Sequence, residues 1–496
     1  MNKQALIKHI ILGEQRMENT DYTTPALYID GEWITQASRY GEVLNPATDE
    51  VLAKFPFADE EQIARALASS EAGFKIWRET SYDERIDIMH RAAAIIRENA
   101  EHTARCMTME HGKPLADSKG EVENCACLLE WCSTAAAEHN DRTLPEMNGF
   151  VDRTVKKEPI GPVAAFPAWN FPASLATRKM ASAMAVGCSV IIKPAKETPV
   201  SFMAMVDALD KAGLPKGVVN ILMGDSALIS KTLIESPVIK KISFTGSTPV
   251  GQQLASLAGD QAKPCVMELG GHAPVLIFND ADIAKATDLS VMTKSRNSGQ
   301  VCISPTRFFV QAAVYDQFLQ GFTEKFAGLR IGNGLDADTQ MGPLANPRRI
   351  GELDALVKDA VDKGARLMSG GKRIDRAGNF YEATVLADVP STARIMQEEP
   401  FGPIAIINKF DTYEEAIETA NNTDFALASY AFSGSQETID NLGRDLDSGK
   451  VGINGFPVVF LDSPLGGRRQ SGYGSEGGYE GLDAYRIVKF VSQSAI

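Results

Sequence analysis

Residues 161–193 of the chain read GPVAAFPAWNFPASLATRKMASAMAVGCSVIIK, the stretch that carries the clearest fold signal in the sequence. The apolar run at 161–166 is typical of a buried strand, and SVIIK at 189–193 is typical of a second one. Residues 173–186 between them have the length and spacing of a helix. Because parallel strands need a crossover connection, the stretch predicts a right-handed strand–helix–strand unit in a parallel sheet.

The same alternation continues on both sides of this unit. Downstream it predicts helices at 200–212, 227–235 and 252–258 and strands at 217–223 and 239–244. A second alternating stretch predicts strands at 273–278, 307–311 and 405–410 and a helix at 316–327. Helical spacing covers residues 60–138, and YRIVKFV at 485–491 is a candidate added strand. The sequence therefore predicts an α/β fold with a parallel, doubly wound sheet and two α/β domains.

Composition and charge exclude several classes of protein. The 496 residues carry 50 Lys and Arg against 64 Asp and Glu, a net charge of −14, which argues against a nucleic-acid partner. The longest nearly apolar run, Met180 to Ile192, is shorter than the roughly 20 residues of a membrane span, so no membrane partner is expected. Seven scattered cysteines and an N-terminus unlike a secretory signal favour a cytoplasmic location.

Two glycine-rich segments match phosphate-binding patterns to different degrees. Residues 472–477, GYGSEG, fit G-x-G-x-x-G, but no apolar strand precedes them, so a glycine-rich loop is the better interpretation. Residues 244–251, FTGSTPVG, follow a predicted strand and open a predicted helix. Their amides can therefore face a pyrophosphate at a helix N-terminus, although such junctions are also common without a ligand.

The cysteines are of two kinds. Cys125, Cys127 and Cys132 have the spacing C-x-C-x₄-C, but they share a predicted helix and no second ligand pair follows, so we expect buried packing and no metal. Cys302 instead follows a glycine-containing turn. A nucleophilic thiol needs a base or a positive field, and Glu268, between an apolar strand and two glycines, is a candidate general base.

Seven motifs occur in order along the chain. They are Phe166-Pro-Ala-Trp169-Asn170-Phe-Pro172, Lys193-Pro-Ala, Phe244-Thr-Gly246-Ser247, Glu268-Leu-Gly-Gly271, Gly299-Gln-Val-Cys302, Glu399-Pro-Phe401-Gly402-Pro and Pro464-Leu-Gly-Gly467. Together they closely resemble the NAD(P)-dependent aldehyde dehydrogenase superfamily, over nearly the whole chain after about Leu27. Within it, the motifs are most similar to those of succinate-semialdehyde dehydrogenases.

The resemblance implies a division of the chain. Residues 21–148 and 160–270 would form a Rossmann-type cofactor domain, and residues 271–470 a second α/β catalytic domain. Residues 149–159 and 480–496 would form a small oligomerisation arm that assembles a homodimer or homotetramer. Residues 1–20 are expected to be an N-terminal extension, in which Met17 is an alternative start.

The resemblance also assigns the catalytic residues. Cys302 would attack the aldehyde carbon as a thiolate, and the Asn170 amide with the Cys302 N–H would form the oxyanion hole for the resulting tetrahedral thiohemiacetal. Loss of a hydride to the nicotinamide would leave a thioester, which Glu268 would hydrolyse by activating water. His272, close to Glu268 in sequence, is a rival base, although the family places no histidine there.

For the cofactor, the resemblance puts Lys193 at the adenosine ribose, Gly246 and Ser247 at the pyrophosphate, and Glu399 with Phe401 at the nicotinamide ribose. Phe166 and Trp169 complete this predicted cofactor site. Relatives that prefer NAD carry an acid three residues after the lysine, where this chain has Lys196 followed by Glu197. A lysine attracts a 2′-phosphate, so we expect NADP to be used at least as well as NAD unless Glu197 substitutes for the acid.

For the substrate, the resemblance puts Arg178 and Arg296 on the distal carboxylate of a semialdehyde such as succinate semialdehyde. A serine that helps bind that carboxylate is replaced near Val459 and Phe460, so an aromatic or medium-chain aldehyde stays open as the alternative. Ser304 stands where some relatives carry a second cysteine, so no regulatory disulfide at the nucleophile is expected.

Two alternative hypotheses, from other classes of protein, have weaker support. A papain-like thiol hydrolase would need histidine and asparagine partners that the sequence does not offer at suitable positions. A non-catalytic structural or binding protein on the same fold would be expected to lose the nucleophile or the base, whereas Cys302 and Glu268 are both present. Dependence of turnover on NAD(P) distinguishes these readings.

Overall fold

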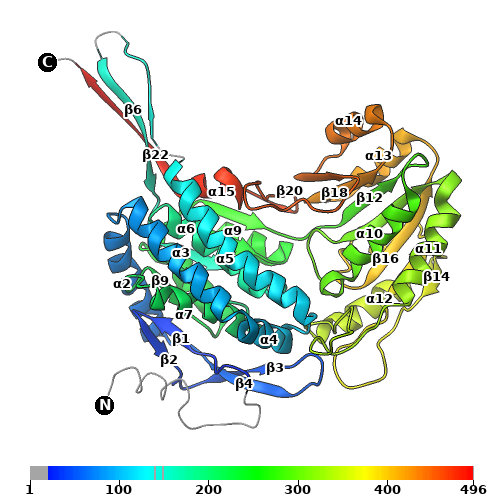
Figure 1. Cartoon of the computed structure of the whole chain (residues 1–496), viewed down its shortest axis with the longest axis horizontal. Helices are drawn as coiled ribbons and strands as arrows, with labels where there is room; N and C mark the ends of the chain where they lie inside the picture. Colours follow the sequence, from blue (N-terminus) through cyan, green and yellow to red (C-terminus); the bar gives the residue numbers. More distant parts are fainter. Residues whose placement is uncertain (1–20, 139–140, 148–149, 495–496) are drawn as a thin grey trace.

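The structure is a computed structural model that describes residues 21–138, 141–147 and 150–494. The predicted extension at residues 1–20, with the alternative start at Met17, lies outside the described residues. Two large sheets with their helices form the body of the molecule, and a thin arm projects from it (Figure 1).

The first sheet has eight strands in the order β2-β1-β9-β8-β7-β10-β11-β21. Its parallel centre is β7 (Val163–Phe166), β8 (Val190–Ile192), β9 (Val219–Ile221), β10 (Lys241–Thr245) and β11 (Cys265–Glu268). Its antiparallel edges are β1 (Leu27–Ile29), β2 (Glu32–Ile34) and β21 (Gly472–Tyr473). The chain runs outward from β7 through β8 to β9 and then returns to β10. The strand order therefore reverses between β7 and β10, a position where α/β sheets commonly bind ligands.

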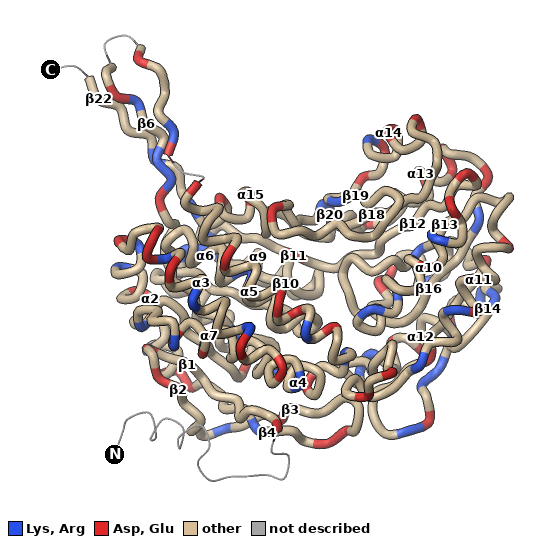
Figure 2. The backbone as a smooth tube through the Cα atoms, in the orientation of Figure 1, with Lys and Arg blue, Asp and Glu red and all other residues tan. Residues whose placement is uncertain are grey.

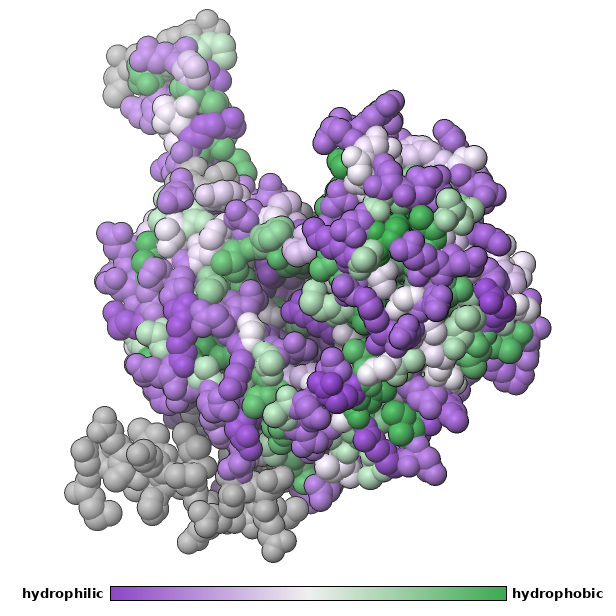
Figure 3. All heavy atoms as spheres, turned by 45° about the vertical axis from the view of Figure 1, so that its right-hand side comes forward, coloured by the Kyte–Doolittle hydropathy of each residue, from purple (hydrophilic) through white to green (hydrophobic). Residues whose placement is uncertain are grey.

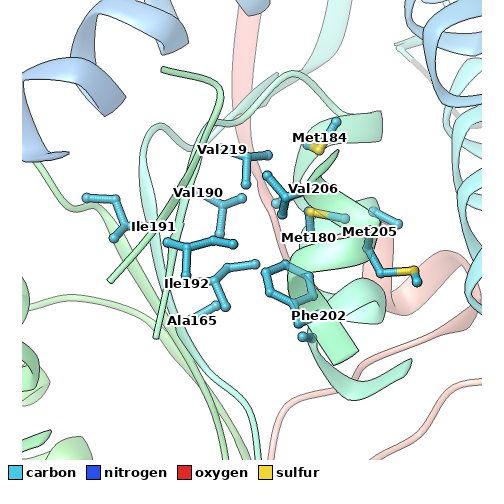
Figure 4. Close-up of a cluster of buried hydrophobic side chains, with 14 of the residues drawn as sticks. Ala165, Met180, Met184, Val190, Ile191, Ile192, Phe202, Met205, Val206 and Val219 are labelled. Atoms are coloured by element: carbon cyan, nitrogen blue, oxygen red, sulfur yellow. The ribbon is translucent and has the colours of Figure 1, made fainter. Parts of the chain in front are cut away.

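Helices join and cover these strands as the alternating pattern predicts. They are α6 (Pro172–Ala185), α7 (Val200–Lys211), α8 (Ser226–Glu235) and α9 (Thr248–Asp260). Met180 of α6 and Phe202 of α7 pack against Ile192 and Val190 of β8 (Figure 4). The upstream helical region forms α2 (Glu60–Trp77), α3 (Tyr82–Glu98), α4 (Ala100–His111) and α5 (Leu115–Glu138). Capping boxes begin α2 and α3.

The second sheet has seven strands in the order β14-β15-β16-β13-β12-β18-β19. They are β12 (Ala273–Ile277), β13 (Pro305–Gln311), β14 (Arg366–Ser369), β15 (Thr384–Ala387), β16 (Ile404–Phe410), β18 (Ala428–Phe432) and β19 (Lys450–Ile453). All pairs are parallel except β14 with β15. The accompanying helices are α10 (Ile283–Ser295), α11 (Tyr315–Ala327), α12 (Arg348–Asp362), α13 (Tyr413–Asn421) and α14 (Gln436–Asp445). The predicted α/β class with parallel sheets is thus confirmed.

The projecting arm consists of β6 (Phe150–Pro159), β22 (Arg486–Ser494) and the short β5 (Arg142–Thr143) (Figure 1). The predicted terminal strand therefore pairs with a segment more than three hundred residues away, Ile487 opposite Glu158. Val488 and Phe490 are exposed on this arm. The division of the chain at residue 270, between β11 and β12, stays a prediction.

Short elements complete the fold. These are β3 (Tyr40–Leu44) with β4 (Val51–Pro56), β17 (Phe425–Ala426) with β20 (Arg468–Arg469), and α15 (Gly478–Asp483). Basic and acidic positions are interspersed over the backbone (Figure 2), and hydrophilic side chains predominate on the face drawn in Figure 3. In the described part of the chain, every helix is too short or too polar to cross a bilayer.

Candidate active site

The candidate residues gather where the two sheets face each other end to end. In the first sheet, Asn170 follows β7, Lys193 follows β8, Ser247 follows β10 and Glu268 ends β11. All four therefore lie at carboxyl ends of parallel strands, beside the reversal of strand order. The second sheet contributes Cys302 from the segment before β13.

Cys302 follows a turn with an uncommon backbone conformation. Asn297, Ser298 and Gly299 have φ values of 55°, 55° and 70°, in the left-handed region that most residues avoid. A Cβ on Gly299 would also lie 2.1 Å from the carbonyl oxygen of Gly402, so this position accepts only glycine. Strained backbone of this kind is concentrated at functional sites.

Cys302 is fixed against the segment that follows β11. A Cβ on Gly271 would lie 2.0 Å from the Cys302 carbonyl oxygen, so glycine is required for this approach. The thiol is partly buried, and its burial together with the carboxylates of Glu399 and Glu268 raises the pKa of Cys302 to about 12. The thiol is therefore neutral in this structure and needs a proton acceptor in order to act as a nucleophile.

Glu268 is a buried carboxylate without a full set of partners. Its side chain is buried, and its Oε1 has no hydrogen-bond partner among the described residues. Burial and the nearby Glu476 carboxylate raise the pKa of Glu268 well above its usual range, whereas Lys179, Arg178 and Lys450 oppose this rise. A raised pKa makes the Glu268 carboxylate a stronger base than an ordinary carboxylate, and its free oxygen can accept a proton.

Glu476, which lies inside the glycine-rich segment 472–477, is a further acidic residue near the site that the sequence did not single out. Glu476 forms a buried ion pair with Lys179, and Ser243 of β10 donates to its Oε1 at 2.9 Å. Lys179 in turn donates to the Ser243 hydroxyl at 3.0 Å. A single acid between glycines carries no sequence signal of its own, so only the fold reveals that it lies near Glu268.

Asn170 presents its side chain toward the turn before Cys302. Its Nδ2 donates to the Gln300 carbonyl at 3.1 Å, and its Oδ1 has no partner among the described residues. The Asn297 amide donates at 2.8 Å to the main-chain carbonyl of Asn170. The side-chain amide thus lies beside the backbone that leads directly to the nucleophile.

His272 is held in the core and is not positioned as a base. Its Nε2 lies 2.9 Å from the Ile395 carbonyl, and its Nδ1 lies 2.9 Å from the Thr306 hydroxyl. Burial lowers the pKa of His272 well below its usual range. Both ring nitrogens are therefore engaged, which removes the rival that the sequence left open.

A pocket of about 740 Å³ opens beside the nucleophile. Val301 and Ile303, on either side of Cys302, line it together with the aromatic rings of Tyr430 and Phe456. The walls are thus largely apolar, and the pocket is large enough for a drug-sized ligand.

The predicted substrate residues take different positions around this pocket. Arg296 lines it, with its guanidinium 5.4 Å from the Phe171 ring. Asp117 lines the same pocket. Arg178 is buried, lies outside the set of lining residues, and has an Nη1 without a partner among the described residues. Phe460 is 53% exposed and also lies outside that set.

The three helical cysteines lie on α5, where Cys125 and Cys132 are buried and Cys127 is partly exposed. Within the described ranges, three or more His, Cys, Asp or Glu side chains nowhere group in a way that could hold a metal ion. Ser304, two residues after the nucleophile, is buried within 3.4 Å of the Lys294 ammonium.

The chain belongs to the aldehyde dehydrogenase family, whose model matches residues 33–491. It is 42% identical to 4-(hydroxymethyl)benzenesulfonate dehydrogenase of Comamonas testosteroni, over 96% of this chain and 99% of the relative. It is 36% identical to succinate-semialdehyde dehydrogenase [NADP(+)] of Escherichia coli, over 93% of this chain and 96% of the relative. A solved succinate-semialdehyde dehydrogenase from Burkholderia pseudomallei superposes with a TM-score of 0.93 at 36% identity, covering 97% and 100% of the two chains.

Members of this family use NAD or NADP, and the residues of this chain fit such a dinucleotide. Ser247, the residue at the N-terminus of α9, is exposed and its side chain does not cap the helix, so this helix N-terminus can accept a phosphate. Lys193 is buried, and its nearest acceptor is the Pro194 carbonyl at 3.4 Å. Glu399 accepts a hydrogen bond of 3.0 Å from the Gly271 amide, and burial raises the pKa of Glu399 to about 7.

Other predicted cofactor residues differ in exposure. The Trp169 and Phe401 rings meet edge to face at 5.6 Å, and Phe166 is buried at the end of β7. Lys196 is exposed, whereas the Glu197 carboxylate lies 3.5 Å from the Asn346 amide. Gly246 donates from its amide to the Glu268 carbonyl at 3.0 Å, which ties the ends of β10 and β11 together.

Proposed function

We propose that this protein oxidises an aldehyde to a carboxylic acid with NAD or NADP, using Cys302 as the nucleophile. The observation that carries the proposal is the convergence of three groups at the junction of the sheets. These are the Cys302 thiol on its left-handed turn, the Glu268 carboxylate with a free oxygen, and the Asn170 amide. Membership of the aldehyde dehydrogenase family supports the reaction type.

In the proposed mechanism, the carboxylate form of Glu268 accepts the Cys302 proton, and the thiolate forms a bond to the aldehyde carbon. The carbonyl π electrons move to oxygen, where the Asn170 Nδ2 and the Cys302 main-chain N–H stabilise the negative charge. The bound nicotinamide supplies the acceptor for the hydride that leaves this carbon. After Glu268 has released the first proton to solvent, its carboxylate takes a proton from water as the water attacks the thioester, and Cys302 departs as a thiolate that is protonated again.

The cofactor contacts are proposed residue by residue. Lys193 donates to the adenosine ribose, and the pyrophosphate lies against the backbone of Gly246 and accepts from the Ser247 amide. Glu399 accepts from the nicotinamide ribose. Phe401, with Phe166 and Trp169 around the same site, shapes the pocket of the ring.

We further propose that NADP is accepted at least as well as NAD. The exposed Lys196 ammonium is free to approach a 2′-phosphate, and the Glu197 carboxylate beside Asn346 is engaged elsewhere. A preference for NAD by more than about 30-fold in kcat/KM, or roughly 2 kcal/mol, would overturn this part.

For the substrate, we propose an aldehyde with an anionic group at its far end, with succinate semialdehyde as the first candidate. Arg296 is the charged side chain that supports this, because it lines the pocket beside the Phe171 ring, although the Asp117 carboxylate in the same pocket interacts with it. Arg178 contributes if it reaches the pocket from its buried position near Glu268. Semialdehyde dehydrogenases among the relatives support the same class.

An aromatic aldehyde, with or without a sulfonate, is the second candidate. The apolar and aromatic walls of the 740 Å³ pocket favour a larger body than a four-carbon acid. The relative from Comamonas testosteroni, at 42% identity, acts on an aromatic sulfonate by its name.

A matched pair of substrates tests the anionic group. Succinate semialdehyde and butanal share a four-carbon chain and differ in the carboxylate. We expect a kcat/KM ratio of about 100 or more, because a charged hydrogen bond contributes roughly 1.5–3 kcal/mol and more than one is available. 4-Formylbenzenesulfonate against benzaldehyde gives the same comparison for the aromatic candidate. A ratio near one in both pairs would overturn the anionic class.

We propose that the protein is a homodimer or homotetramer assembled through the arm of β6 and β22. The exposed Val488 and Phe490 on the projecting arm support an interface there. Light scattering on the chain with and without Val488→Glu measures the assembly.

A further inference from the structure

A buried ion pair lies directly behind Asn170, and neither residue was singled out from the sequence. Lys113, in the short link between α4 and α5, donates from Nζ to the Glu121 Oε2 of α5 at 2.6 Å. The two side chains are only 1% and 3% exposed. Burying two charges is costly, and such pairs often contribute little net stability. A buried pair at this position is therefore a candidate for a specific functional role.

Lys113 contacts Asn170 directly. Its Nζ donates to the main-chain carbonyl of Asn170 at 3.0 Å, beside the Asn297 amide that donates to the same oxygen at 2.8 Å. The ammonium also lies 4.5 Å from the centre of the Phe171 ring. Charge-assisted hydrogen bonds of this kind are stronger than neutral ones, and the low dielectric around them strengthens them further.

Glu121 fixes the other side of the same segment. Its Oε1 accepts from the amides of Ala173 and Ser174, each at 3.0 Å, in the first turn of α6. Phe171, at the N-terminus of α6, offers no side-chain cap, so a carboxylate from α5 supplies the capping that the segment itself lacks. The segment from the Asn170 carbonyl to the Ser174 amide is therefore held by one ion pair.

We propose that Lys113, held in place by Glu121, is a positioning residue that fixes Asn170 for stabilising the oxyanion. This inference rests on the proposed function, in which the Asn170 amide is an oxyanion donor. Such a donor lowers the barrier only if it already points to the place where negative charge develops, because reorienting it during the reaction costs part of the gain. Lys113 acts on the Asn170 main chain and does not itself touch the substrate.

A double-mutant cycle with Asn170 tests this role. The reference, Glu121→Gln, removes the carboxylate charge and leaves the Lys113 donor, whereas Lys113→Met combined with Glu121→Gln removes the donor and leaves no unpaired buried charge. Relative to Glu121→Gln, we expect the combined variant to lose at least tenfold in kcat, with KM changed less than threefold. When Asn170→Ala is also present, the same Lys113 change is expected to alter kcat less than twofold.

The rate of Cys302 alkylation by iodoacetamide separates positioning from general damage. Alkylation forms no oxyanion, so it is expected to stay within twofold while kcat falls. A parallel fall of both rates, an unchanged kcat, or an equal loss with and without Asn170 would each overturn the inference. If the methionine variant does not fold, Lys113→Gln in the Glu121→Gln background shortens the side chain by one atom, breaks the 3.0 Å contact and is expected to give the same pattern.

The experiment also distinguishes this inference from the proposed function. Asn170→Ala alone must lower kcat by at least tenfold while alkylation of Cys302 is preserved. If Asn170→Ala has no effect, the proposed oxyanion role of Asn170 fails, and the position of Lys113 has no bearing on that result.

Discussion

The two sheets contribute to the site from opposite ends of their strands. The first sheet presents Asn170, Lys193, Ser247 and Glu268 where parallel strands end, beside the reversal of strand order. The second sheet presents Cys302 before its strand β13 begins. Binding and proton-transfer groups thus come from the rigid carboxyl edge that α/β folds commonly use. The nucleophile comes from a left-handed turn that only close packing can hold.

The surroundings of Glu268, from the first sheet, and of Cys302, from the second sheet, also differ. Around Glu268, the charges of Glu476, Lys179, Arg178 and Lys450 act on one buried carboxylate, so proton chemistry is set there. Around Cys302, the pocket walls are mostly apolar, with Arg296 and Asp117 among the few charges, so substrate choice is set there. Mutations on the first side are therefore expected to change rate and pH dependence, and mutations on the second side to change specificity.

Glu268→Gln tests the first side and has the largest expected effect. Removing a general base typically costs between 10² and 10⁴ in rate, so we expect kcat to fall by about 1,000-fold. The loss of Glu268 slows both activation of the thiol and hydrolysis of the thioester, so the acyl adduct forms slowly on Cys302 and is then expected to persist. Intact-protein mass spectrometry after mixing with aldehyde and cofactor detects this adduct, and Glu480→Gln on the exposed surface of α15 is the matched control. A loss below tenfold without an adduct would contradict the assignment.

Arg296→Met tests the second side. Loss of a charged contact to the substrate is expected to lower kcat/KM for succinate semialdehyde by about 10- to 100-fold, while butanal is unaffected. The change should leave the rate of Cys302 alkylation unaltered, since Arg296 belongs to the pocket wall and not to the nucleophile's turn. Equal losses on both aldehydes would instead mean that Arg296 supports the turn through Phe171.

Much of the first sheet could be predicted from the sequence because its signals are local. The runs at 161–166 and 189–193 are short, apolar and separated by one helix, so the strand–helix–strand unit follows from periodicity. The observed β7, α6 and β8 end within a few residues of the predicted bounds. The pairing of β22 with β6 depends instead on a contact between distant segments, which periodicity does not encode.

Some residues of the site could also be predicted from the sequence, whereas others could not. Cys302 and Glu268 could be singled out because each lies beside glycines in a recognisable motif. Lys113 and Glu476 could not, because an isolated lysine or glutamate has an ordinary surface pattern in sequence, and their burial arises only when separate segments pack together. The position of Arg178 outside the pocket lining likewise depends on side-chain direction along α6, which residue spacing leaves open.

Lys196→Ser tests the cofactor edge of the first sheet. A lysine near a 2′-phosphate is expected to contribute about 1 kcal/mol at an exposed position, so kcat/KM for NADP should fall about fivefold. The value for NAD should change less than twofold, because it carries no 2′-phosphate. Lys216→Ser, at another exposed turn, is the control. An equal fall for both cofactors would place Lys196 outside the phosphate site.

Glu476→Gln tests how the buried charges set the proton chemistry of Glu268, with the smallest expected effect on activity. The Glu476 carboxylate raises the pKa of Glu268, and its loss leaves Lys179, which lowers that pKa. The base works in its ionised form, so activity is lost as pH falls through the Glu268 pKa. The acid limb of kcat/KM should therefore move to lower pH, by about one unit or less.

The same variant leaves Lys179 as a buried cation without its carboxylate, so the free energy of unfolding should drop by about 3 kcal/mol. Activity and stability thus respond in separable ways: the pH profile reports on Glu268, and denaturant unfolding reports on the broken pair. Lys179→Met combined with Glu476→Gln removes both charges and should recover part of the stability. Because Glu476 raises the pKa of Glu268 more than Lys179 lowers it, the double variant should retain a shift of the acid limb to lower pH. A shift to higher pH in either variant would show that Glu476 does not act on Glu268 through its charge.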